Sequence, residues 1–109
     1  WISTLDAQGR PNLAPYSFFN MVQTRPALCA FGSDGMKHTA ANAIAAGEFV
    51  VNLATRPLFD AMNASSAALA EGEDEFAHAG LEPAPCRVVR PPRVALSPAA
   101  LECKVVHAM

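Results

Sequence analysis

Short stretches rich in apolar residues alternate with turn-forming residues along most of the chain. Trp1–Leu5 is one such stretch; a polar turn at Asp6–Arg10 follows it, and Asn12–Ser17 resumes the extended pattern. Gly9 gives this turn a residue that tolerates a positive φ. The pattern predicts a β-hairpin at the start of the chain.

Three further stretches have the composition of strands. Ala27–Gly32 is apolar at nearly every position, and we expect it to be a central strand buried on both faces. Glu48–Ala54 and Leu101–Val106 predict two more strands. The prolines at 91 and 92 favour extended chain around them.

Short helices are predicted between these strands. Thr39 is the expected N-cap of a helix through Ala46, with Gly47 just past its end. Thr55–Met62 and Glu73–Ala79 predict two more short helices. The chain is therefore mainly β with short helices, which suits an antiparallel barrel or α+β domain better than a doubly wound sheet.

Charge and composition narrow the class. The 109 residues carry a net charge of −2 and only 17% charged residues, so part of the surface is expected to be covered by a subunit, a ligand or further chain. Basic residues are scattered, which predicts no nucleic-acid or acidic-lipid partner. The longest apolar run, Ala27–Phe31, is far shorter than the ~20 residues of a membrane span.

The cysteines and the two ends of the chain also carry information. Cys29, Cys86 and Cys103 are widely spaced and form no Cys-x-x-Cys, so neither a disulfide framework nor a zinc site is expected, and a reducing cytoplasm is the expected location.

The chain opens directly on a strand and stops without a polar tail. We expect a partial domain, incomplete at both ends.

An aromatic segment is the first candidate site. Tyr16, Ser17, Phe18, Phe19 and Asn20 place a hydroxyl and an amide beside three rings. A flat heteroaromatic ligand needs apolar walls and a few fixed polar groups, which this segment supplies. The alternative is a strand end with ordinary core phenylalanines.

A second candidate lies where a glycine-containing turn leads into a predicted helix. Ser33, Lys37 and Thr39 surround this point, where free N–H groups and the positive end of the helix dipole would suit a phosphate. The alternative is a capped helix with an exposed lysine. One segment suits a ring and the other a phosphate, and together they predict a nucleotide-like cofactor.

Other polar residues suggest less. The three histidines, His38, His78 and His107, have no metal-like spacing, and we expect surface or packing roles for them. The acidic run Glu71–Glu75 is expected to be a solvated loop and first helical turn. Ser17 has no evident base nearby, so no catalytic residue is predicted.

At these residues the sequence resembles the flavin reductase-like family, the FMN-binding split-barrel flavoproteins. The segment from Asn12 to Asn20 is similar to the family's hallmark segment, and Lys37-His38-Thr39 with Asn42 is similar to its Lys-Asp-Thr-x-x-Asn step, with His38 in place of the usual Asp. Phe49-Val50-Val51-Asn52-Leu53 is similar to the strand that follows. The likeness covers residues 1–109 as the N-terminal and middle portion of a family domain.

The resemblance implies a six-stranded antiparallel barrel that binds FMN, with FAD possible, usually as a homodimer. It implies that Tyr16, Ser17, Phe18, Phe19 and Asn20 line the isoalloxazine and ribityl region. It also implies that the residues of the second candidate site, Ser33, Lys37 and Thr39, hold the phosphate.

The activity that the resemblance implies is an NAD(P)H-dependent flavin reductase, in which hydride passes from NADH or NADPH to the bound flavin. A monooxygenase or another electron acceptor is the expected partner. Two alternatives stay open: a flavin-binding electron carrier without its own NAD(P)H activity, and a structural barrel that binds no ligand.

Overall fold

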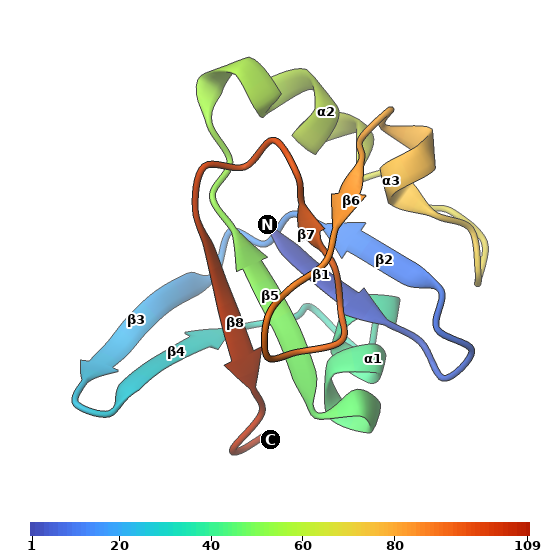
Figure 1. Cartoon of the computed structure of the whole chain (residues 1–109). Helices are drawn as coiled ribbons and strands as arrows, with labels where there is room; N and C mark the ends of the chain where they lie inside the picture. Colours follow the sequence, from blue (N-terminus) through green and yellow to red (C-terminus); the bar gives the residue numbers. More distant parts are fainter.

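The computed structural model describes residues 1–109, and its central layer is a four-stranded antiparallel sheet (Figure 1). The strands run in the order β2-β1-β5-β8, and every pairing is antiparallel. Their bounds are Pro11–Ala14 for β2, Ile2–Leu5 for β1, Glu48–Asn52 for β5 and Ala100–Lys104 for β8. The predicted opening hairpin is confirmed as β1 and β2.

Two strand pairs and four short helical segments surround this sheet. The pairs are β3 (Phe19–Thr24) with β4 (Ala27–Phe31) and β6 (Pro83–Ala84) with β7 (Arg93–Val94). The helical segments are α1 (His38–Ala46), η1 (Arg56–Leu58), α2 (Phe59–Ala64) and α3 (Glu75–His78). The predicted class, mainly β with short helices, is confirmed.

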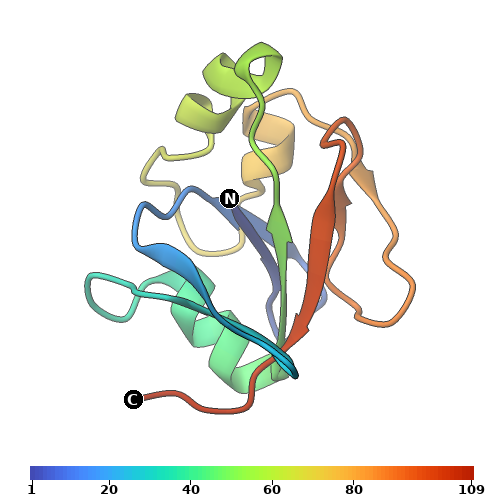
Figure 2. The same ribbon diagram turned by 90° about the vertical axis from the view of Figure 1, so that its left-hand side faces the viewer.

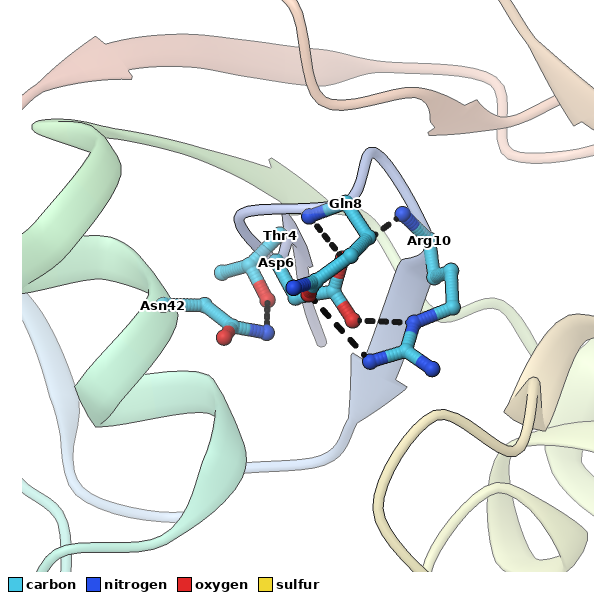
Figure 3. A network of polar contacts seen from close by, with 5 residues as sticks. All are labelled: Thr4, Asp6, Gln8, Arg10 and Asn42. Atoms are coloured by element: carbon cyan, nitrogen blue, oxygen red, sulfur yellow. Dashed lines mark hydrogen bonds and ion pairs between the residues drawn. The ribbon is translucent and has the colours of Figure 1, made fainter.

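The turn between β1 and β2 is fixed by one carboxylate. Asp6 accepts hydrogen bonds from the backbone N–H groups of Gln8 and Arg10, at 2.9 and 2.8 Å, and from the Arg10 Nε at 2.6 Å (Figure 3). Gly9 completes the turn with a φ of 78°. On the neighbouring helix, the Asn42 side chain donates to the Thr4 hydroxyl at 3.2 Å, which ties α1 to β1 (Figure 3).

The strand predicted to be central is not central. Ala27–Phe31 forms β4, which pairs only with β3, and this hairpin extends away from the main sheet (Figure 1). The buried central strands are β1 and β5 instead. No residue of β4 is fully buried, and Ala27 and Ala30 are exposed, so the expected burial on both faces is wrong as well. Only one face of β4, with Cys29 and Phe31, packs on the second core described next.

The sheet carries a hydrophobic cluster on each side. The larger one comprises Trp1, Leu13, Leu58, Phe76, Leu81 and Val94. The smaller one, which we call the second core, is built on Ile2, Ala43 and Phe49, with partly buried neighbours that include Cys29, Phe31 and Cys103. The second core therefore joins α1, the main sheet and the β3–β4 hairpin.

A buried amide connects three strands. Asn52 is 2% exposed; its Nδ2 donates to the Trp1 carbonyl and the Ser3 hydroxyl, and its Oδ1 accepts from the Val94 N–H at 2.8 Å. Since a buried amide with satisfied donors and acceptor fixes its neighbours, β1, β5 and β7 hold one arrangement.

The helices depart from the sequence predictions in detail. The helix predicted over Thr55–Met62 begins as the 3₁₀ turn η1 and continues as α2 to Ala64. The third helix is shorter than expected, because Asp74 caps it by accepting from the Phe76 N–H at 2.8 Å. None of the helices has the length and apolar character that a membrane crossing requires.

Candidate functional site

Three segments enclose a cleft of about 620 Å³ beside the sheet. They are the connection from β2 to β3, the turn that leads into α1, and the chain after α2; Figure 2 shows these loops on the left of the molecule. Glu75 of α3 also lines the cleft. The volume lies within the ~300–1,000 Å³ typical of small-molecule sites.

The cleft contains five of the eight predicted site residues. These are Tyr16, Ser17, Phe18, Lys37 and Thr39. The other three lie outside its lining: Phe19 and Asn20 begin β3, and the Ser33 hydroxyl donates to the Gly35 carbonyl at 2.8 Å. Residues from both predicted segments therefore line one cleft, and their contacts with a ligand stay predictions.

Part of the cleft lining is aromatic. The Phe18 side chain is 78% exposed, although phenylalanine is among the residues that gain most from burial. The backbone behind it is fixed, because the Gly32 N–H donates to the Phe18 carbonyl at 2.8 Å. Tyr16 packs on Phe31 with the ring centroids 5.0 Å apart. This part of the lining therefore presents an exposed ring on a backbone that is held by a hydrogen bond.

Lys37 and the first turn of α1 bring positive charge to the cleft, whose lining also includes the carboxyl groups of Asp34 and Glu75. Lys37 occupies the N-cap position of α1, and no side chain caps this helix. The N–H groups of His38, Thr39 and Ala40 donate to no backbone oxygen, and Ala41 is the first to do so. A positive helix end beside a lysine ammonium favours an anion such as a phosphate.

Thr39 was predicted to cap α1, and that prediction is wrong. Thr39 lies within the first turn and is 2% exposed. Its hydroxyl donates at 2.7 Å to the side-chain oxygen of Asn12, whose nitrogen then faces the carboxylate of Glu75 at 3.2 Å. The amide takes this orientation because an ionised carboxylate only accepts hydrogen bonds.

Glu75 is a site residue that sequence analysis missed. It was expected to be solvated with the rest of the acidic run, but it is 6% exposed. Its Oε1 also accepts from the Leu13 N–H at 3.1 Å. Burial is the main cause that raises the pKa of the Glu75 carboxyl. Nothing in the run of acidic letters separates Glu75 from its neighbours, so only the fold could identify it.

The third wall of the cleft is anchored from the core. The Trp1 indole donates to the Ser65 hydroxyl at 3.0 Å, and that hydroxyl donates to the Met62 carbonyl at 2.7 Å. Further along the same loop, Gly72 has a φ of 84° and lies against the Arg10 guanidinium. The loop that follows α2 and lines the cleft is therefore held in place by Trp1, just before β1, and by Arg10 in the β1–β2 turn.

Comparison with known proteins identifies the family. A model of the flavin reductase like domain matches residues 1–109, and the chain therefore belongs to the flavin reductase-like family. A protein of Deinococcus radiodurans, described as an uncharacterized protein, is 43% identical over 101 residues, covering 88% of this chain and 44% of its own length. YwrF of Bacillus subtilis, also described as uncharacterized, is 32% identical over 96% of this chain and 53% of its own length.

Solved structures agree with this assignment. Nitrilotriacetate monooxygenase component B from Bacillus cereus superposes with a TM-score of 0.92 at 32% identity, covering 97% of this chain and 55% of that one. Flavoredoxin of Desulfovibrio vulgaris gives a TM-score of 0.92 at 26% identity over 99% of this chain and 59% of its own. The expected split-barrel fold of the flavin reductases is confirmed, and the chain spans about half the length of the relatives it matches.

Proposed function

We propose that the protein is an FMN-binding oxidoreductase that accepts hydride from NADH or NADPH. The observation that carries this proposal is one cleft that is lined both by the exposed Phe18 ring and by Lys37 with the free N–H groups of α1. A ligand that contacts both kinds of group has a flat ring system and a phosphate.

The donor set fits FMN. Lys37 and the first-turn N–H groups would hold the phosphate, because each supplies a donor and positive potential. Tyr16, Ser17 and Phe18 would contact the ring and ribityl chain. We keep Phe19, Asn20 and Ser33 as predicted contacts, although they lie outside the lining, and Thr39 would contribute through its oxygen, since its proton is directed to Asn12.

A bound flavin would supply the redox chemistry by accepting the hydride. The protein's own residues would hold and orient the reactants. An apolar wall at Phe18 would hold ring systems face to face, which replaces a chance collision with a pre-arranged contact. Hydride transfer needs no acid or base from the protein, and accordingly we assign no catalytic residue.

The family and the surface of the protein support proposals for the cofactor, the oligomeric state and the electron acceptor. We propose FMN as the cofactor, with FAD as the alternative, because the flavin reductase-like family implies a flavin. A homodimer is supported by the low charge fraction and by exposed apolar side chains such as Val22 and Met36, which are 61% and 72% exposed. A monooxygenase as electron acceptor is supported by the likeness to a protein named as a monooxygenase component.

A second candidate function is electron transfer without NAD(P)H activity. The likeness to a flavoredoxin favours it, since that name describes an electron carrier. Its cleft would hold the flavin in the same way, and the two functions differ only in whether a nicotinamide reaches the ring.

The two functions separate in one experiment on the full-length protein. The holoprotein is mixed anaerobically with NADH or NADPH while the visible flavin absorbance is followed. Rapid bleaching supports the reductase, and bleaching only by dithionite supports the carrier. A purified protein that is colourless and takes up no added FMN contradicts both.

A further inference from the structure

Two cysteines that are 74 residues apart in sequence face each other between the β3–β4 hairpin and the main sheet. The Cys29 sulfur on β4 lies 3.8 Å from the Cys103 sulfur on β8. Both side chains are only partly buried and belong to the second core. We propose that Cys29 and Cys103 form an intramolecular disulfide when the protein is exposed to hydrogen peroxide, and that this bond fastens the hairpin to the sheet.

Position is the first argument. The hairpin makes strand hydrogen bonds only within itself, because β3 and β4 form a separate two-stranded sheet. It is held to the main sheet by side chains such as Phe31, whose ring centroid lies 5.1 Å from that of Phe49. Cys29 and Cys103 are among those side chains. A covalent bond here would cross a junction between two sheets that no strand pairing secures.

The chemistry balances with peroxide as the oxidant. The Cys29 thiolate attacks one peroxide oxygen, the O–O bond breaks, and a sulfenic acid and a first water form. The Cys103 sulfur then attacks the sulfenic sulfur, the S–O bond breaks, and a second water leaves with the thiol proton. The two thiols lose two electrons in total, and peroxide is reduced to two waters.

The surroundings favour Cys29 as the first nucleophile. Burial, followed by the nearby Cys29, raises the pKa of the Cys103 thiol to about 12. The raised pKa disfavours the Cys103 thiolate, so Cys103 is the second sulfur in the proposed sequence. Cys86 provides an internal comparison, because it is also free and partly buried but has no sulfur partner.

The bond would affect the wall of the cleft as well as stability. Its β4 end lies three residues before Gly32, whose N–H fixes the Phe18 carbonyl. A cross-link that closes so long a loop lowers the conformational entropy of the unfolded chain. We therefore expect the melting temperature to rise by about 10 °C on oxidation. The Cys29→Ala and Cys103→Ala variants should each lose this rise, whereas Cys86→Ala should keep it.

The test is a peptide map of the full-length protein of natural sequence. The protein is treated with a small excess of hydrogen peroxide, blocked with iodoacetamide, digested without reductant and examined by mass spectrometry. The expected product is one linked peptide pair containing Cys29 and Cys103, lost after dithiothreitol. A map in which peroxide leaves both thiols free, oxidises them separately, or links either to Cys86 overturns the proposal, and this outcome does not depend on whether any variant folds or on whether flavin binds.

Discussion

The Thr39 hydroxyl lies 2.7 Å from the Asn12 side chain, so a hydrogen bond joins the first turn of α1 to β2. Both residues belong to the lining of the cleft. Glu75 extends the same chain of contacts to α3 at 3.2 Å. These buried hydrogen bonds of Thr39, Asn12 and Glu75, which we call the buried polar relay, hold the start of α1 in place, and no side chain caps the helix.

Removing the hydroxyl of this relay should destabilise the fold. In Thr39→Val the oxygen of the buried Asn12 amide loses its donor, and we expect the free energy of unfolding to fall by about 1–3 kcal/mol. Urea unfolding followed by circular dichroism measures the change. Thr39→Ser is the matched control, since it keeps the hydroxyl and loses one methyl group, which costs about 0.8 kcal/mol. Equal stability of the valine and natural proteins would exclude a structural role for this contact.

Glu75 should make stability fall as the pH rises. Burial raises the folded-state pKa of the Glu75 carboxyl, so the native protein binds this proton more tightly than the unfolded chain does. The stabilising contribution is present below the unfolded-state pKa and is lost as the pH rises through the folded-state pKa. The Glu75→Gln variant has no such titration, and its free energy of unfolding relative to the natural protein should therefore improve with rising pH.

Two other carboxylates act in the opposite direction and define the control. Backbone N–H donors lower the pKa of Asp6 and of Glu102, and the stability they contribute is lost as the pH falls. Both are unchanged in Glu75→Gln, so the difference between the two proteins isolates Glu75. A difference that stays constant from acid to neutral pH would contradict the assignment.

Lys37 should distinguish FMN from riboflavin, which lacks the phosphate. We expect Lys37→Ala to weaken FMN binding by about 1–3 kcal/mol, or roughly fivefold to 150-fold, and to leave riboflavin binding unchanged. Fluorescence titration gives both affinities. Lys104→Ala, at an exposed position on β8 outside the cleft, is the matched variant and should bind both ligands normally. An equal loss for FMN and riboflavin would place the phosphate elsewhere.

Phe18 should affect both ligands alike. Its ring is 78% exposed, so Phe18→Ala should leave the free energy of unfolding within about 0.5 kcal/mol of the natural value. If the ring covers a flavin, FMN and riboflavin should both bind about tenfold more weakly. Phe59→Ala removes a 55% exposed ring on α2 outside the cleft and should change neither affinity.

Sequence patterns were sufficient where the cause is local. The β1–β2 turn was predicted from Gly9 and its polar neighbours, and the end of α1 from Gly47, whose φ of 73° and N–H bond to the Ala43 carbonyl close the helix. The two segments that share the cleft were also identified, because each carries its own chemical signature. These features depend on residues close together in the chain.

The failures depend on distant residues. Thr39 has the right chemistry for a cap, but its hydroxyl is used by Asn12, 27 residues earlier. Glu75 is buried because α3 packs on β2, which the acidic run does not show. The β4 strand was misplaced because its apolar pattern does not show that it pairs with β3 alone or that only one of its faces packs on the second core. Each error concerns contacts between residues that are far apart in the sequence and come together only in the folded protein.

The most direct test is a crystal structure of the full-length protein grown with FMN. We predict electron density in the cleft, with the phosphate within hydrogen-bond distance of Lys37 and the N–H groups of His38 and Thr39, and with the ring system against Phe18. Density for FMN at another surface, or a cleft filled only by solvent at saturating FMN, would contradict the proposed site.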